Sequence, residues 1–251
     1  MKKLMKDFVL PELPKRFDLP IIYHKVIKTV GIGESWLADL IKDWENALPE
    51  HIRLAYLPSL GHVKLRLTAF GKDKNQLIEE VQTQIDAVFP LIEKYIYGYD
   101  EETLETAIGK LLKNAGKTLA LAESCSGGYI SQLVTSIAGS SAYFQGSVVP
   151  YQNEFKEKIL GVTAETLASV GAVSEETARE MAIGVRNLFG VDFGLSSTGI
   201  AGPDGGSEEK PVGTVWIACA GDGFVETKKL QLTQDRMLNI QLTGVSVLNL
   251  L

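Results

Sequence analysis

The carboxyl-terminal part of the sequence contains no histidine. The three histidines, His24, His51 and His62, all precede residue 100. A self-contained enzyme in the later part therefore cannot use an imidazole as its general base. Unless another chain or domain supplies one, this absence excludes Ser-His-Asp and Cys-His catalysis there.

Cysteines are few, and long apolar segments are absent. The two cysteines, Cys125 and Cys219, form no metal-binding spacing and suit a reducing compartment, so we expect a cytoplasmic protein with no metal site. No apolar run approaches the ~20 residues that a membrane helix needs. The opening MKKLMKDFVLPELPKRFDLP lacks the apolar region of a secretory signal. We expect no membrane partner.

An excess of positive charge is also missing. Residues 1–100 carry 14 Lys and Arg against 14 Asp and Glu, whereas residues 101–251 carry 11 against 17. Domains that bind nucleic acid usually present a clear basic excess. We therefore expect no nucleic-acid partner.

Hydrophobic periodicity predicts a small α+β domain in the first part of the chain. The order of the predicted elements is β-α-β-β-α-β, which is typical of a split βαβ domain. Strands are predicted over 21–31, 51–57, 62–70 and 94–98, and helices over 33–48 and 73–89.

The second part of the chain alternates apolar strands with amphipathic helices. This alternation predicts a mostly parallel sheet between helices, with the functional loops at the carboxyl ends of the strands. Strands are predicted over 117–124, 146–151, 191–198, 212–220 and 224–232, and helices over 104–112, 129–137, 153–161, 175–189 and from about 234 to the end.

The segment AESCSGGY lies between a predicted buried strand and a predicted helix. Free backbone N–H groups at the helix start, with Gly127 and Gly128 allowing close approach, favour a bound anion. The pattern is neither G-x-S-x-G nor a Walker loop, so it assigns no mechanism. A tight turn with Ser126 as the helix cap is the alternative.

The glycine-rich segment 196–213 follows another buried strand. Unstructured loops of this length are usually functional or flexible. Thr198, Gly199 and Gly202 at its start are the candidate ligand contacts, and a flexible surface loop is the alternative.

Lys156 is the candidate general base, because burial can lower the pKa of a lysine enough to replace histidine. A Ser–Lys pair with Tyr151 as a relay would supply an activated nucleophile. The alternative is a solvated lysine paired with Glu154 or Glu157, and spacing alone favours it.

Arg236 opens the last predicted helix, where the helix dipole disfavours a cation. Either an anionic ligand or the neighbouring Asp235 can compensate that charge. Ser140 and Ser141 follow an earlier helix, and sequence physics does not decide between a capping role and a site role for them.

Together these segments resemble the CinA family. LALAESCSGG, AGSSAYFQGSVVPYQNEFKEKILGV, GAVSEETAREMA and STGIAGPDGGSEEKPVGTVWIA look like the carboxyl-terminal domain of CinA proteins, which is similar to bacterial nicotinamide mononucleotide (NMN) deamidases. VGIGESWLADL and LAYLPSLGHVKLRLTA look like the KH-type middle domain.

The resemblance implies three regions. Residues 1–20 are the remnant or linker of a missing amino-terminal domain, residues 21–99 a KH-type α+β domain, and residues 100–251 a three-layer α/β/α sandwich. The missing molybdopterin-binding-like domain is linked in the family to ADP-ribose pyrophosphatase activity, which we do not carry over. We expect a truncated form or late start of a longer protein.

The resemblance further implies a homodimer that hydrolyses the carboxamide of NMN to nicotinate mononucleotide and ammonia, without a metal or organic cofactor. Ser141 is the first choice of nucleophile and Ser124 the second. The sequence departs from the usual family pattern at Pro150, Ser126 and Gln152. The implied site residues are Ser124, Ser141, Tyr151, Lys156, Thr198 and Arg236.

In the resulting hypothesis, neutral Lys156 activates the serine directly or through Tyr151. Backbone N–H groups or the Thr198 hydroxyl hold the oxyanion, and Arg236 and the glycine-rich turns hold the phosphate. The alternative is a catalytically weak nucleotide-binding or interaction module whose KH-type domain binds RNA.

Overall fold

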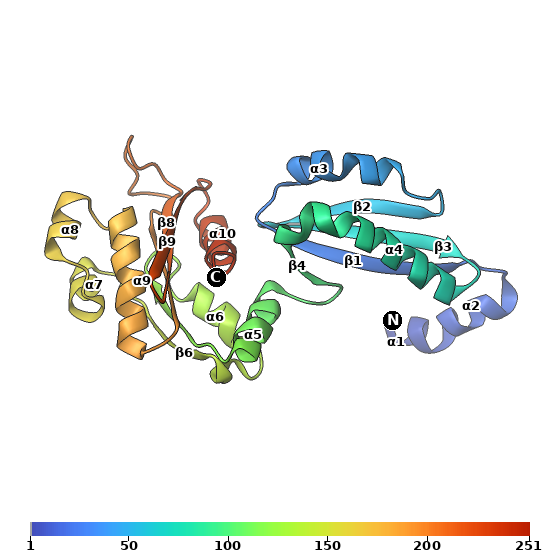
Figure 1. Cartoon of the computed structure of the whole chain (residues 1–251), viewed down its shortest axis with the longest axis horizontal. Coiled ribbons are helices and arrows are strands. Elements are labelled where there is room, and N and C mark those ends of the chain that lie inside the picture. Colours follow the sequence, from blue (N-terminus) through green and yellow to red (C-terminus); the bar gives the residue numbers. More distant parts are fainter. Residues whose placement is uncertain (1) are drawn as a thin grey trace. The chain divides into compact units, whose positions relative to one another are not determined.

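A computed structural model describes residues 2–251. The chain forms two compact units, one ending at Asp100 and one spanning Glu101–Leu251 (Figure 1). Each unit is described by itself.

The first unit is a four-stranded antiparallel sheet with both long helices on one face (Figure 1). The strand order is β2-β3-β1-β4, and the predicted split βαβ arrangement is confirmed. The elements are β1 (Ile21–Val30), α3 (Glu34–Asn46), β2 (Ile52–Ser59), β3 (His62–Gly71), α4 (Lys74–Ile92), the 3₁₀ turn η2 (Glu93–Tyr95) and β4 (Ile96–Tyr99).

The core of this unit follows from the strand alternation. Leu65, Leu67 and Ala69 of β3 are fully buried, and they pack with Leu37 and Ile41 of α3. Alternate residues of the strand point to the opposite face of the sheet. The helices therefore cover one face of the sheet only.

The residues before β1 are helical. They form α1 (Lys2–Leu4), the π-helical segment η1 (Met5–Val9) and α2 (Leu10–Arg16), where the sequence analysis expected a remnant or linker. Neither η1 nor α2 contains a buried residue.

The second unit is built on a five-stranded sheet with the order β6-β5-β7-β8-β9. β5 pairs in parallel with β6 and β7, whereas β8 pairs antiparallel with both β7 and β9, so the sheet is mixed and not mostly parallel in its pairing as predicted. No helix crosses over between β7 and β8 or between β8 and β9, and parallel pairing requires such a crossover. The strands are β5 (Leu119–Glu123), β6 (Phe144–Val148), β7 (Phe193–Gly199), β8 (Thr214–Gly221) and β9 (Phe224–Gln231).

Helices cover both faces of this sheet, which makes the three-layer α/β/α sandwich (Figure 1). One layer contains α5 (Leu104–Ala115), α6 (Tyr129–Thr135) and α10 (Arg236–Leu248). The other contains α7 (Asn153–Leu160), α8 (Ala164–Ser169) and α9 (Glu175–Phe189). The short α8 was not predicted, and η3 (Ser140–Ala142) precedes β6. Across residues 2–251, no helix has the length and apolar character needed to span a bilayer.

The last residue of β5, Glu123, fixes the start of α6. Its fully buried carboxylate accepts backbone N–H bonds from Gly128 (3.1 Å), Ile130 (2.9 Å) and Ser131 (2.7 Å). It also accepts hydroxyl bonds from Ser126 and Ser131. These donors are the helix-terminal groups that the sequence analysis expected to be free for an anionic ligand. The protein's own carboxylate occupies that position.

We expect Glu123→Ala to lower the free energy of unfolding of the second unit by about 3 kcal/mol, because several buried donors lose their acceptor. Calorimetry of the full chain measures this change. Glu165→Ala, which removes an exposed carboxylate from α8, is the control and should change stability by less than about 0.5 kcal/mol. Equal effects of the two substitutions would contradict the structural role of Glu123.

Candidate active site

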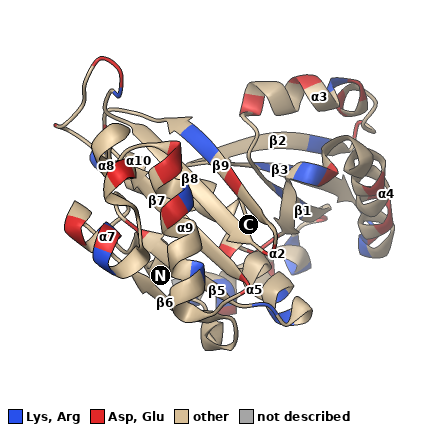
Figure 2. Ribbon diagram, turned by 60° about the vertical axis from the view of Figure 1, so that its left-hand side comes forward, with Lys and Arg blue, Asp and Glu red and all other residues tan. Residues whose placement is uncertain are grey.

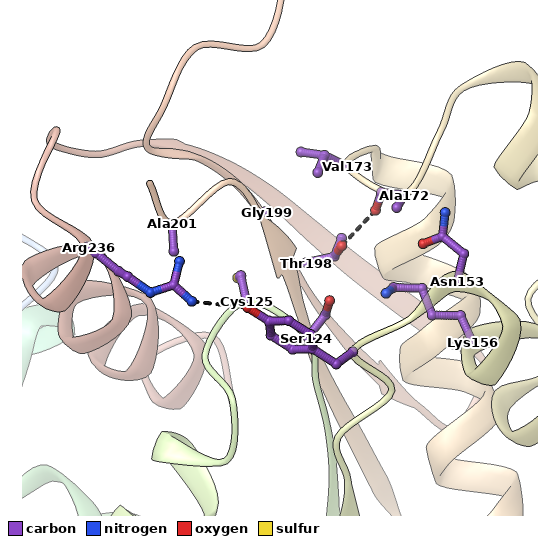
Figure 3. A pocket seen from close by; sticks show the side chains of 11 residues that line it. Ser124, Cys125, Asn153, Lys156, Ala172, Val173, Thr198, Gly199, Ala201 and Arg236 are labelled. Carbon is purple, nitrogen blue, oxygen red and sulfur yellow. Dashed lines mark hydrogen bonds between the residues drawn. The ribbon is translucent and has the colours of Figure 1, made fainter. Parts of the chain in front are cut away.

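A pocket of about 190 Å³ opens at the carboxyl ends of β5 and β7, where the sequence analysis expected the functional loops (Figure 3). It brings together residues from five separate segments of the second unit. The lining residues are Ser124, Cys125, Tyr151, Asn153, Lys156, Ala172, Val173, Thr198, Gly199, Ala201 and Arg236.

Lys156 is buried in the wall of this pocket. It and Leu160, one helical turn later, are the buried residues of α7, and only 1% of the Lys156 surface is exposed. Its Nζ donates a hydrogen bond of 2.8 Å to the carbonyl oxygen of Pro150. Glu154 instead forms an ion pair with Lys158. The alternative of a solvated, paired lysine is therefore wrong.

The environment of Lys156 disfavours its charged form. Burial removes the ammonium from water and lowers the pKa of Lys156 below its ordinary value of 10.5. Within residues 2–251 no carboxylate lies within salt-bridge distance of its Nζ. A lysine in this state can accept a proton closer to neutral pH than an exposed lysine can.

Ser124 lies opposite this lysine, in the first position after β5. Figure 3 shows the Lys156 amine and the Ser124 hydroxyl both projecting into the pocket. The backbone N–H of Ser124 donates to the Ser197 carbonyl (2.9 Å), which extends the pairing of β5 with β7 by one residue. Ser124 is therefore held on a rigid strand end.

Two backbone donors follow Ser124 directly. Among the described residues no oxygen atom accepts a hydrogen bond from the N–H groups of Cys125 and Ser126, and the Cys125 N–H interacts with its own thiol. Adjacent N–H groups after a nucleophile are a common source of oxyanion stabilisation. By their position in the sequence, these two N–H groups are the donors best placed to stabilise an oxyanion formed by attack of Ser124.

Cys125 is not a competing nucleophile. Its thiol is buried, and the loss of solvation raises its pKa to about 12. The reactive thiolate is therefore scarce at neutral pH.

Thr198 and Gly199, both predicted contacts, line the pocket. The Thr198 hydroxyl donates to the Ala172 carbonyl (2.6 Å), so its proton is already used. This finding counts against the expectation that Thr198 donates to an oxyanion. Gly199 is required by packing, because a Cβ there would lie 2.8 Å from the Thr214 carbonyl oxygen.

Arg236 reaches the pocket from the first turn of α10. Its guanidinium donates to the Gly202 carbonyl (2.7 Å) and to the Tyr151 hydroxyl (3.0 Å). Asp235 caps the helix by accepting from the Leu238 N–H (2.9 Å). Neutral groups therefore hold Arg236, and its charge is available to an anion.

Tyr151 is not placed as a proton relay. Its hydroxyl is hydrogen-bonded to Arg236, and the residue is 56% exposed. The bond that Lys156 makes goes to a backbone carbonyl. The structure thus connects Tyr151 to Arg236 and not to the lysine.

Ser141 does not line the pocket. It is exposed in η3, before the amino end of β6. The Leu119 N–H donates to the Tyr143 carbonyl (2.7 Å), so this segment lies beside the start of β5. Ser124 follows the other end of β5. The choice of Ser141 as the nucleophile is therefore corrected, because Ser141 lies near the amino end of β5 and Ser124 follows its carboxyl end.

The remaining predicted glycines serve the backbone. Gly127 and Gly128 adopt positive φ angles of 62° and 97° and lie outside the pocket lining. Their N–H groups donate to the Ser124 carbonyl and the Glu123 carboxylate. Gly202 contributes the carbonyl that holds Arg236. None of the three lines the pocket, so the prediction that they contact a ligand directly is not supported by their positions.

Sequence reasoning missed Glu123, Asn153 and Asn239. A carboxylate just before a helix start is a recognisable capping signal, so Glu123 could have been found. Asn239 donates to the Ala201 carbonyl (2.9 Å) and fastens the glycine-rich loop to α10, a contact that no sequence signal indicates. Among residues 2–251, no cluster of three or more His, Cys, Asp or Glu side chains could hold a metal ion.

Solved structures similar to the chain resemble its second unit. The competence/damage inducible protein CihA from Agrobacterium tumefaciens is 39% identical, with a TM-score of 0.57 over 58% of this chain and 89% of that one. A CinA superfamily protein from Escherichia coli is 30% identical, with a TM-score of 0.56 over 59% of this chain and 88% of that one.

Relatives in sequence extend over the whole chain. A CinA-like protein from Cytophaga hutchinsonii is 56% identical and one from Amoebophilus asiaticus 49%, each over all of this chain. The chain spans 60% of the length of each. Residues 24–98 match the damage-inducible protein CinA KH domain, and residues 101–251 match the CinA C-terminal domain. The chain therefore belongs to the CinA family.

Proposed function

We propose that the second unit hydrolyses the carboxamide of NMN to nicotinate mononucleotide and ammonia. The observation that carries this proposal is the buried Lys156 facing Ser124, in a pocket that also presents Arg236. Serine and a lysine of lowered pKa can form an acyl-transfer pair without histidine, which this part of the sequence lacks. Arg236 supplies the positive charge that a substrate phosphate requires.

The first half of the reaction forms an acyl-enzyme. Neutral Lys156 accepts the proton of the Ser124 hydroxyl as Oγ attacks the carboxamide carbon. The N–H groups of Cys125 and Ser126 stabilise the negative oxygen of the tetrahedral intermediate. The lysine then gives its proton to the amide nitrogen, the C–N bond breaks, and ammonia leaves.

The second half releases the acid. Lys156, neutral again, takes a proton from a water molecule that attacks the ester carbonyl carbon. Collapse of the second tetrahedral intermediate returns the proton to Ser124 Oγ and frees nicotinate mononucleotide. Nucleophile and base are regenerated, and no cofactor is consumed.

Replacing Ser124 with alanine should reduce ammonia release from NMN by about 10³-fold or more, because the attacking oxygen is lost. Ser141→Ala, which changes a residue near the amino end of β5 and outside the pocket lining, should retain turnover within about twofold. Normal turnover in Ser124→Ala would contradict the assignment. NMN binding without turnover in the unmodified chain would support the binding-module alternative.

The rate should depend on pH through Lys156. Only neutral lysine acts as the base, so kcat/KM should rise with pH and level off above a pKa that lies below 10.5. Lys156→Arg should be inactive at every accessible pH, because arginine does not lose its proton. A Lys156→Ala enzyme with an unchanged pH profile would exclude the lysine as the base.

Lys156 should lower the stability of the fold near neutral pH. Its lowered pKa means that the unfolded chain binds the proton more tightly, so stability rises with pH between the lowered pKa and 10.5. We expect Lys156→Met to raise the free energy of unfolding at pH 7 by about 1 kcal/mol, while abolishing turnover. Calorimetry at several pH values measures both the increase and the loss of the pH slope, and a marked destabilisation would contradict the desolvation argument.

Arg236→Met should weaken recognition of the substrate phosphate. We expect a rise in KM for NMN of about 10-fold to 100-fold, since a charge-assisted pair contributes roughly 1.5–3 kcal/mol. Nicotinamide riboside, which lacks the phosphate, is the control substrate and should respond little to the substitution. An equal rise in KM for both substrates would show that Arg236 does not bind the phosphate.

A further inference from the structure

One polar side chain of the pocket, that of Asn153, has no part in the reaction proposed above. Asn153 is the first residue of α7 and lines the pocket together with Lys156, three positions later. Residues three apart are neighbours on one face of a helix. Figure 3 shows both side chains on one side of the pocket and Arg236 on the opposite side. Asn153 therefore lies beside the proposed general base, at the end of the pocket opposite the proposed phosphate contact.

The side-chain amide of Asn153 is available to a ligand. Within residues 2–251 it makes no hydrogen bond, and the residue is exposed. Apart from Ser124, the other polar side chains of the lining each hydrogen-bond to a protein group. An amide offers an acceptor oxygen and an NH₂ donor group. Asn153 can therefore bind a substrate group without giving up a contact within the protein.

The neighbouring lysine requires this side chain to be uncharged. A carboxylate at position 153, one helical turn before Lys156, would pair with the ammonium and counteract the lowering of its pKa by burial. Acidic residues do occur on α7 (Figure 2), but Glu154 forms its ion pair with Lys158. The ionisable side chains that share the pocket lining with Lys156 are those of Cys125, Tyr151 and Arg236. Asparagine thus supplies an acceptor oxygen here without a negative charge.

We propose that Asn153 makes the site specific for primary carboxamides, by accepting a hydrogen bond from the amino group of the substrate. This inference rests on the proposed amidase function. The N–H donors that follow Ser124 bind the carbonyl oxygen of the substrate, so its nitrogen is left to the side of the pocket where α7 lies. With one N–H held by Asn153 Oδ1, the lone pair that develops on nitrogen in the tetrahedral intermediate is turned toward Lys156. The lysine proton then adds to this nitrogen as the C–N bond breaks.

The test compares an amide with an ester, using the full chain. NMN and the methyl ester of nicotinate mononucleotide share the ring, the ribose and the phosphate, but the ester has no N–H for Asn153 to accept. We expect Asn153→Ala to lower kcat for ammonia release from NMN by about 10-fold, an effect of the size that one hydrogen bond supplies. Methanol release from the ester should stay within about twofold. Asn153 makes no hydrogen bond within residues 2–251, so the variant should fold normally.

A second variant, Asn153→Asp, keeps the acceptor oxygen and adds the charge. Its carboxylate should raise the pKa of Lys156, so kcat/KM for NMN should level off at a higher pH than in the unmodified chain. Above that pH the variant should turn over NMN faster than Asn153→Ala does, because the bond to the substrate N–H is restored. A merely structural role for Asn153 predicts neither the shift of the pH profile nor the recovery.

Gln152→Ala is the matched control. It removes an exposed amide from the neighbouring position, which lies outside the pocket lining and makes no side-chain cap to α7. Turnover of both substrates should stay within about twofold. Equal losses of amide and ester hydrolysis in Asn153→Ala would overturn this inference alone, because the residue would then act on a part that both substrates share. No ammonia release from NMN by the unmodified chain at any pH would instead reject the amidase function, and this inference with it.

Discussion

The second unit depends on one buried carboxylate. Glu123 ends β5 and binds the first N–H groups of α6, so strand, turn and helix become one rigid corner. A buried carboxylate is tolerated only where hydrogen bonds replace its water, and here five donors do so. The turn that holds Ser124 is thereby fixed, and no oxygen atom of the described residues accepts a hydrogen bond from the N–H groups of Cys125 and Ser126.

The active site contains a second buried ionisable group, Lys156, whose environment differs from that of Glu123. Glu123 is fully compensated by donors, whereas Lys156 has, among the described residues, only the Pro150 carbonyl oxygen as its hydrogen-bond partner. The protein therefore keeps a buried amine whose charged form burial disfavours, at a cost in stability. Such a cost is typical of functional positions, where a group is kept in the state that the chemistry requires. The same logic explains why Arg236 is held by Gly202 and Tyr151 and not by a carboxylate.

Sequence predicted much of this arrangement, and its errors have physical causes. Periodicity located most strands and helices, and the lack of histidine directed attention to Lys156. Strand direction depends on crossovers between elements, so the antiparallel pairing of β7 with β8 was missed. Ser141 was assigned from resemblance. Only the register of β6 against β5 shows that Ser141 lies near the amino end of β5, away from the pocket. The partner of Tyr151 is 85 positions away in sequence, which local patterns do not reach.

The central claim is that burial lowers the pKa of Lys156, which lets its amine act as the general base. An NMR titration of the lysine side chains tests it directly, with Lys156→Met identifying the resonance of interest. The account predicts one lysine resonance, absent from the variant, that titrates with a pKa below the ordinary 10.5. A Lys156 resonance that titrates at 10.5 or above would contradict the account, because the lysine would then remain charged and could not accept the serine proton.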